Sequence, residues 1–173
     1  YLGDDVTATL RLWLEPGEQA AGALAKQLFN DQALGLGQPD PNRIAFINKA
    51  DRPSAPRHQD TCTPSRLADL EWGEATSQSV QYDDDVNIVL DLGAPKDISR
   101  IRVYAYHQRS PAGYRVGRIA LGTSDDKSAW QPAGEIKNTS DGSENLIELS
   151  APLRARARYV KLFFEKAPGA HRM

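Results

Sequence analysis

Residues 86–106, VNIVLDLGAPKDISRIRVYAY, decide the fold class. Hydrophobic and polar residues alternate from 86 to 92 and again from 98 to 106, which is the period of a β-strand with one buried face. The tripeptide GAP at 93–95 interrupts this alternation with residues that favour turns. The stretch therefore predicts two strands joined by a turn.

Shorter alternating runs recur on both sides of this stretch, at 43–47, 115–121, 145–149 and 158–164. Clusters of turn-forming residues separate the runs, and no helical periodicity lies between them. Short strands joined by turns, without helices, are typical of an antiparallel β-sandwich or barrel. We therefore expect an all-β, antiparallel β-sandwich for residues 42–173.

The first 41 residues follow a different pattern. Residues 5–15 alternate in polarity, which predicts a half-buried strand. Residues 18–30 carry an apolar stripe at helical spacing, which predicts a short amphipathic helix, and the Gly- and Pro-rich stretch 34–41 predicts a connector. We expect residues 1–41 to be the end of a preceding domain or an extension packed on the sandwich.

The composition excludes several classes of protein. Among 173 residues, 21 Lys and Arg stand against 23 Asp and Glu, so the net charge of −2 gives no overall attraction for nucleic acid. No apolar run approaches the roughly 18 residues of a membrane span. Cys62 is the only cysteine, which excludes an internal disulfide and a cysteine-rich zinc site. The chain begins with Tyr1, and we expect it to be a processed chain or a fragment.

Motifs of common enzyme classes are absent from the sequence. It contains no Gly-rich phosphate loop, no G-x-S-x-G nucleophile elbow and no pair of histidines at metal-binding spacing. His58, His107 and His171 lie in separate segments, with no nucleophile or orienting partner nearby in sequence. The run of aspartates at 83–85 is most simply a solvated loop before a strand. We expect no catalytic residues and no organic cofactor.

Six short motifs occur in one order along the second part of the chain. They are NRIA at 42–45, RLAD at 66–69, IVLDLG at 88–93, ISRIRV at 98–103, SDDKSAW at 124–130 and ARYVKL at 157–162. This series resembles the discoidin family, also called coagulation factor V/VIII type C domains, within the galactose-binding-like superfamily. The resemblance covers about residues 42–173 and implies a β-sandwich jelly roll of about eight strands.

The resemblance also implies a structural Ca²⁺ held by an aspartate, a threonine, backbone carbonyls and a glutamate of the final strand. Asp69 matches the aspartate and Thr76 could match the threonine, and oxygen ligands suit this hard cation. The sequence departs from the family pattern at two expected glycines, which are replaced by Leu70 and Lys127. Leu70 lies beside the calcium site and disfavours the turn that the glycine permits. The final strand with its acidic residue is also missing, because the chain stops at Met173, where that strand should begin.

In a sandwich of this kind, loops at one end carry binding while the strands form a scaffold. The resemblance places such loops at 69–82, 107–117 and 165–172. A sugar needs an aromatic ring for its C–H face and polar side chains for its hydroxyls. The candidate ligand-binding residues are therefore Trp72, His107, Arg109, Tyr114, Arg115 and His171. For each of them, ordinary packing or a solvated loop without ligand is the alternative.

A second candidate surface is basic. Arg154, Arg156 and Arg158 alternate, so on a strand they share one face and could hold a sulfate, carboxylate or phosphate group. The alternative is a charged edge strand that prevents aggregation.

The resemblance implies a non-catalytic carbohydrate-binding module of a larger secreted glycan-active protein, with a neighbouring catalytic domain and a secreted, cell-surface or periplasmic location. A first alternative is an adhesion domain that binds protein or phospholipid through the same loops or the arginine stripe. A second is a small hydrolase that uses a histidine and carboxylates. These functions differ in salt dependence, because ionic contacts weaken with salt and sugar stacking does not.

Overall fold

The computed structural model describes residues 10–16, 44–61, 65–68, 79–107, 113–141 and 143–173. Six strands make up the secondary structure of these ranges: β1 (Leu10–Pro16), β2 (Ile47–Ala50), β3 (Val86–Tyr106), β4 (Val116–Ser124), β5 (Gln131–Lys137) and β6 (Leu146–Lys166). They form one antiparallel sheet in the order β1-β3-β6-β4-β5, with β2 also paired to β3. The helix expected at 18–30 lies outside the described residues. The described part of the chain holds no helix suited to crossing a membrane.

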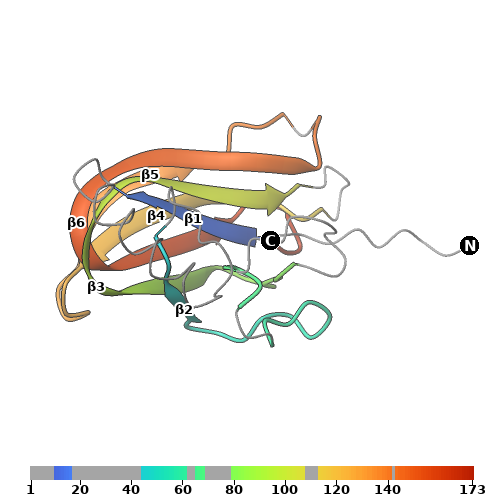
Figure 1. Ribbon diagram of the computed structural model, residues 1–173. Coiled ribbons are helices and arrows are strands. Elements are labelled where there is room, and N and C mark those ends of the chain that lie inside the picture. The colour runs from blue at the N-terminus through green and yellow to red at the C-terminus, as the bar shows by residue number, and fades with distance from the viewer. Residues whose placement is uncertain (1–9, 17–43, 62–64, 69–78, 108–112, 142) are drawn as a thin grey trace, which may run out of the picture.

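The two longest strands, β3 and β6, pair with each other on both sides of a shared bend (Figure 1). Pairing runs from Val86 with Phe164 to Tyr106 with Leu146, and its register shifts between Asp91 and Lys96. One layer of the folded sheet contains β1 with the second half of β3 and the first half of β6. The other contains β2, the remaining halves, β4 and β5. The six strands therefore supply eight strand segments, and the expected β-sandwich is confirmed.

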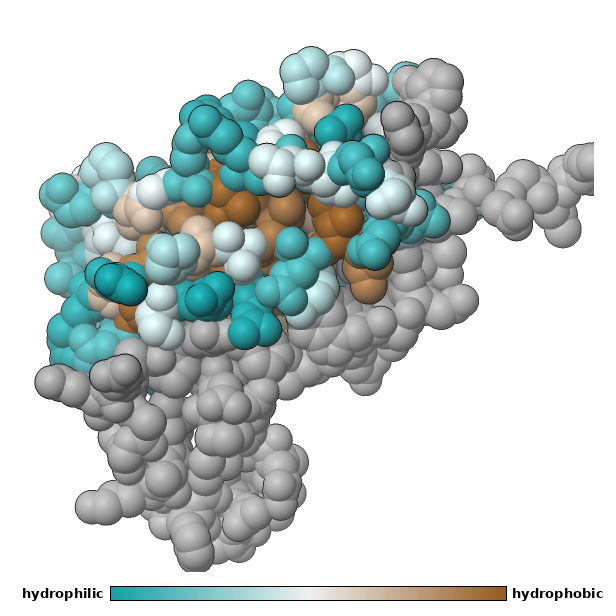
Figure 2. All heavy atoms as spheres, turned by 90° about the horizontal axis from the view of Figure 1, so that it is seen from above, coloured by the Kyte–Doolittle hydropathy of each residue, from teal (hydrophilic) through white to brown (hydrophobic). Residues whose placement is uncertain are grey.

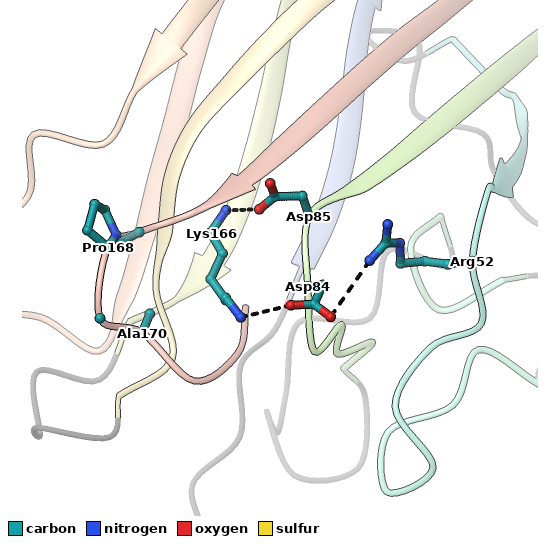
Figure 3. A pocket seen from close by; sticks show the side chains of 8 residues that line it. Arg52, Asp84, Asp85, Lys166, Pro168 and Ala170 are labelled. Atoms are coloured by element: carbon teal, nitrogen blue, oxygen red, sulfur yellow. Dashed lines mark hydrogen bonds and ion pairs between the residues drawn. The ribbon is translucent and has the colours of Figure 1, made fainter.

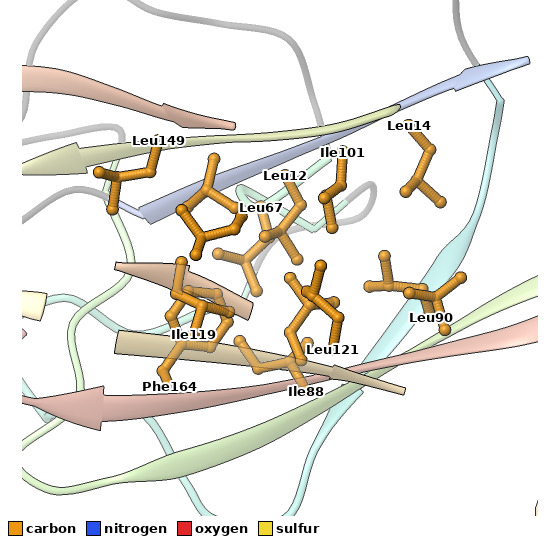
Figure 4. Packing of buried hydrophobic residues seen from close by; sticks show 14 of the residues in the cluster. Leu12, Leu14, Leu67, Ile88, Leu90, Ile101, Ile119, Leu121, Leu149 and Phe164 are labelled. Atoms are coloured by element: carbon orange, nitrogen blue, oxygen red, sulfur yellow. The ribbon is translucent and has the colours of Figure 1, made fainter. Parts of the chain in front are cut away.

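The core lies between the two layers. Alternate residues of β3, such as Ile88, Leu90 and Ile101, are fully buried, and Ile119 of β4 and Phe164 of β6 meet them from the neighbouring strands (Figure 4). Each such side chain stabilises the fold by about 1.5–3 kcal/mol relative to an exposed position. The hydrophobic positions of the alternating sequence at 86–92 and 98–106 are therefore on the face of β3 that the fold buries.

A bend within β3 replaces the turn expected at 93–95. Gly93 adopts a φ of 78°, which a side chain would strain, and its N–H donates to Asp91 Oδ1 at 2.9 Å. The strands expected at 86–92 and 98–106 are therefore one strand, and those expected at 145–149 and 158–164 merge into β6 in the same way.

Two further expectations differ from the structure. The strand expected at 43–47 begins only at Ile47. Before it, the N–H of Ile44 donates to Leu14 O of β1 at 2.9 Å, and the side chain of Ile44 is buried in the core. β5 was not expected, since Pro132 and Gly134 hide its periodicity. Both residues are tolerated there because β5 lies at the edge of the sheet and pairs only with β4 among the described strands.

Several small side chains at the margin of the core are only partly buried. Ala133, Ala151 and Ala155 are among those that pack against the core. Seen from above, hydrophobic residues form a band along the middle of the molecule, with hydrophilic residues on both sides (Figure 2).

β1 belongs to the same sheet and core as the later strands. It pairs with β3 from Leu10 opposite Ala105 onward, and its other edge is also bonded, since Leu12 N donates to Leu67 O at 3.1 Å. Leu12 and Leu14 are 2% and 0% exposed, which confirms the predicted inward face at these positions. The division of the chain into residues 1–41 and 42–173 stays a prediction.

Replacing Leu14 by Ala tests how much β1 contributes to stability. The side chain is fully buried, so we expect Leu14→Ala to lower the free energy of unfolding by about 2–5 kcal/mol. Urea denaturation followed by circular dichroism measures the change. Ile47→Ala is the control, because Ile47 is 79% exposed on β2 and should cost no more than about 0.5 kcal/mol. Equal effects of the two substitutions would show that β1 does not contribute to the stable core.

Candidate functional site

Three segments converge at the end of the sandwich opposite the bend. Tyr82 and Met173 exchange two backbone hydrogen bonds, of 2.8 and 3.0 Å. The N–H of Arg115 donates to Arg172 O at 2.9 Å, and the N–H of Ala167 donates to Arg115 O at 2.9 Å. The C-terminal residues are thus bonded on one side to the segment before β3 and on the other to the segment before β4. Parts of all three loops predicted to carry binding meet here.

A cleft of about 430 Å³ opens here between the C-terminal residues, the aspartates before β3 and Arg52 (Figure 3). Lys166, the last residue of β6, lies at its centre. Its ammonium group donates to Asp84 Oδ1 at 3.0 Å and to the carbonyl of Asp83 at 2.8 Å, and its backbone N–H donates to Asp85 Oδ1 at 2.8 Å. The cleft is lined by Arg52, Asp84, Asp85, Lys166, Ala167, Pro168, Gly169 and Ala170. We call it the Lys166 cleft.

Charges of opposite sign alternate around the Lys166 cleft. Arg52 Nη1 lies 4.0 Å from Asp84 Oδ2, and Arg172 Nε lies 2.9 Å from Asp83 Oδ1 beside the cleft. The side chains of Asp84 and Arg52 are 69% and 42% exposed, so both keep access to solvent. Three cations and three aspartates therefore nearly cancel, and the cleft offers donors and acceptors without a strong net charge.

A tight turn shapes the far wall of the cleft. Gly169 has a φ of 78°, and the N–H of Ala170 donates to Ala167 O at 3.0 Å. The turn presents Pro168 and Ala170 beside the charged groups (Figure 3). The cleft thus combines a small apolar surface with hydrogen-bonding groups, which suits a ligand that carries both C–H and O–H groups.

Three of the residues predicted from the sequence lie next to the cleft. Tyr114 forms a β-bridge with Arg172, Arg115 Nη2 donates to Ser140 O at 3.4 Å, and His171 is exposed with its N–H bonded to Gly113 O at 3.1 Å. None of the three is among the residues that line the Lys166 cleft.

The other predicted residues are placed differently. His107 is 1% exposed at the end of β3, so its ring does not face solvent. Its backbone N–H donates to Asn145 O at 2.5 Å. Trp72 and Arg109 lie outside the described residues, as do the calcium candidates Asp69 and Thr76. Within the described ranges, no group of three His, Cys, Asp or Glu side chains could hold a metal ion.

Arg52, Asp84, Asp85 and Lys166 line the cleft but were not among the predicted site residues. The aspartate run at 83–85 was expected to be a solvated loop. Its position directly before a buried strand was the available signal, because strand ends meet at the ends of a sandwich. Lys166 follows the last predicted strand in the same manner.

Two arginines of the arginine stripe, Arg156 and Arg158, form ion pairs with β3. Arg156 Nη1 donates to Asp97 Oδ2 at 2.9 Å, and Arg158 contacts both carboxylate oxygens of Asp91, at 3.1 and 3.3 Å. The hydrogen bonds from Arg158 lower the pKa of Asp91. The two ion pairs stabilise the bend and neutralise two of the three arginines of the stripe, while Arg154 is exposed.

A buried polar cluster adjoins the segment that precedes the cleft aspartates. His58 is 3% exposed, its Nδ1 lies 3.1 Å from Ser79 Oγ, and its carbonyl accepts the N–H of Gln81 at 3.2 Å. Burial lowers the pKa of His58, and the positive charges of Arg57, Arg66 and Arg172 lower it further. Within the described chain, no hydrogen-bond partner reaches His58 Nε2, so a proton there would lack an acceptor.

Comparisons with known proteins give one family match. The model of the F5/8 type C domain family matches residues 54–173. No curated protein matches the chain.

Several solved structures are similar to this chain at low sequence identity. The family 32 carbohydrate-binding module of Clostridium perfringens NanJ, in complex with galactose, is 10% identical over 72% of this chain and 85% of that chain, with a TM-score of 0.48. The C-terminal domain of a Bacteroides fragilis chitobiase is 15% identical over 73% and 83%, with a TM-score of 0.45. CpGH89CBM32-5 of C. perfringens, in complex with GalNAc-β-1,3-galactose, is 19% identical over 72% and 92%, with a TM-score of 0.44.

The buried cluster predicts a stability that falls in mild acid. The folded-state pKa of His58 lies below its unfolded value, so the unfolded chain binds more protons below about pH 6.5. We therefore expect the free energy of unfolding to drop between pH 7 and pH 5.5, by at most about 1.4 kcal/mol per pH unit for this group. His58→Gln should flatten this slope in urea titrations at several pH values. An unchanged slope in the variant would rule out His58 as its source.

Proposed function

The chain belongs to the F5/8 type C domain family, and from this premise we propose that it is a non-catalytic carbohydrate-binding module. Its ligand occupies the Lys166 cleft, with Tyr114 and His171 at the margin. The module belongs to a larger secreted, glycan-active protein and holds that protein's catalytic domain near its substrate.

The observation that supports this proposal is the mixed lining of the cleft. Sugar hydroxyls both donate and accept hydrogen bonds, so they suit a site where Asp84 accepts and Arg52 donates within 4.0 Å of each other. Pro168 and Ala170 offer an apolar surface to the C–H groups of the ring. Because the charges nearly cancel, the cleft favours a neutral ligand over a strongly anionic one.

An open cleft of this size predicts weak binding. A dissociation constant between about micromolar and millimolar corresponds to roughly −8 to −4 kcal/mol. Weak binding still serves a tethered enzyme, because a linked binding site raises the local concentration of substrate.

Substitutions at the exposed rim of the cleft test the proposal. A glycan array identifies the best-bound sugar, and titration calorimetry then measures its affinity for the wild type, Asp84→Asn and Arg52→Gln. We expect each substitution to raise Kd by about tenfold or more, because each removes a charge-assisted hydrogen bond worth at least about 1.5 kcal/mol.

Glu144→Gln provides a matched control. Glu144 is an exposed carboxylate outside the cleft, so its substitution should leave Kd unchanged. The absence of any glycan binding on the array would contradict the proposed function. Binding that resists both rim substitutions would place the ligand elsewhere.

We propose a structural Ca²⁺ as a second part of this function, with Asp69 and Thr76 as its side-chain ligands. Carboxylate and hydroxyl oxygens are the donors that Ca²⁺ prefers. At a hundredfold excess over Kd, binding adds about 2.7 kcal/mol, which corresponds to a rise in Tm of about 5–10 °C. Thermal unfolding with CaCl₂ and with EDTA measures this shift. Asp69→Asn should abolish it, and equal Tm values for the wild type in both buffers would contradict the site.

A further inference from the structure

A second hollow lies at the bent end of the sandwich, where β4 ends and β5 begins. Its volume is about 280 Å³, near the lower limit of about 300 Å³ for small-molecule pockets, so it suits a ligand of one ring. Its lining consists of Thr123, Ser124, Asp125, Asp126, Ala129, Gln131, Arg156 and Ala157. We call it the Asp125 cavity. Val116, at the start of β4, pairs with Lys166, and Ser124 at its end lines the cavity. The eight steps of about 3.3 Å between them separate the two sites by about 26 Å.

The β4–β5 turn gives the cavity a rigid, charged wall. Asp126 accepts hydrogen bonds from the N–H and the hydroxyl of Ser128 and from the N–H of Ala129. These bonds, together with one from Ser124, lower the pKa of Asp126 to about 2, so it stays ionised. Lys127, at a φ of 67°, closes the turn and directs its ammonium group to the ring of Tyr159, 4.4 Å away.

Other lining groups remain available to a ligand. Asp125 is exposed and uses Oδ1 to accept the Arg158 N–H at 3.2 Å, and the described contacts leave its second oxygen open. Arg156 is 63% exposed and contacts Asp97 through Nη1 alone, which leaves further N–H groups toward the cavity. Gln131 and Thr123 are paired on neighbouring strands at the same rim. The cavity therefore presents donors and acceptors together.

The net charge of the Asp125 cavity is negative, unlike that of the Lys166 cleft. Two carboxylates, those of Asp125 and Asp126, face one guanidinium, that of Arg156, which Asp97 already neutralises. The neighbouring cations, Lys127 and Arg158, are directed to Asp91, at 4.0 and 3.1 Å. A ligand with a positive group gains from this field, and a carboxylate-bearing ligand is repelled.

We propose that the Asp125 cavity is a second sugar-binding site, and that it selects a sugar unit with a protonated amino group. The ammonium group is placed against Asp125, and the ring hydroxyls bond to Thr123, Gln131 and Arg156. The inference extends the proposed function but does not depend on the Lys166 cleft. Two sites about 26 Å apart allow one module to hold an amino-sugar polymer at two points or to bridge two chains.

Amide chemical shifts of the full chain test this proposal with three matched probes: glucosamine, glucose and glucuronate. At about pH 6 the amine of glucosamine is protonated. We expect glucosamine to shift the amides of Asp125, Asp126, Ala129 and Gln131, with a Kd about tenfold lower than that of glucose, and glucuronate to leave them unchanged. Asp125→Asn retains the acceptor for Arg158 and should raise the Kd of glucosamine about tenfold. Glu144→Gln should not change it.

Two results would overturn the second site. The first is the absence of glucosamine shifts at the β4–β5 turn. The second is that ethanolamine, an ammonium without a sugar ring, binds there as tightly as glucosamine. Because shifts around Lys166 report separately on the first cleft, failure at the bend is distinguished from failure of the proposed function.

Discussion

β3 and β6 must bend at the same point, because they pair with each other on both sides of it and a bend in only one of them would separate the paired segments. Gly93 permits the bend in β3 with its positive φ, and Asp91 and Asp97 hold the facing stretch of β6 through Arg158 and Arg156. Both layers, the core between them and the two separated ends of the sandwich follow from this shared bend. Arg156 and Arg158, which the sequence suggested as part of a ligand surface, thus stabilise the fold through their ion pairs.

Aromatic rings near the bend are covered by cations of the same face. Lys127 and Arg158 lie 4.4 and 4.8 Å from the ring centre of Tyr159, and Lys161 lies 4.4 Å from that of Trp130. Such contacts stabilise by about 0.5–1 kcal/mol at exposed sites. The rings therefore have partners already and are not open platforms for a sugar. The ligand that we propose for the Asp125 cavity would therefore be bound mainly by polar groups, which is why its selectivity is expected to depend on charge.

Local periodicity was enough to predict the layers but not their connection. The alternation in 86–92 and 98–106 identified the buried faces, yet GAP at 93–95 is equally compatible with a hairpin turn and with a bend. Only the pairing of Asp91 and Asp97 with arginines more than fifty residues later distinguishes a bend from a hairpin turn at this position. The cleft was missed for the same reason. The sequence shows that the aspartate run and Lys166 each adjoin the end of a strand, but not that the two, about eighty residues apart, lie against each other.

The pairing of β1 with β3 joins residues that are far apart along the chain, since Leu10 faces Ala105 and Leu14 faces Ile101. The first and last strands of the described sheet therefore find their places only after long loops have closed. Chains dominated by such distant contacts fold slowly, in milliseconds to seconds, because the entropy of loop closure is lost before the contacts form. During that interval the apolar faces of β3 and β6 remain open to other chains. The edge proline and the surface charges then have a kinetic role: they limit association while the sandwich closes.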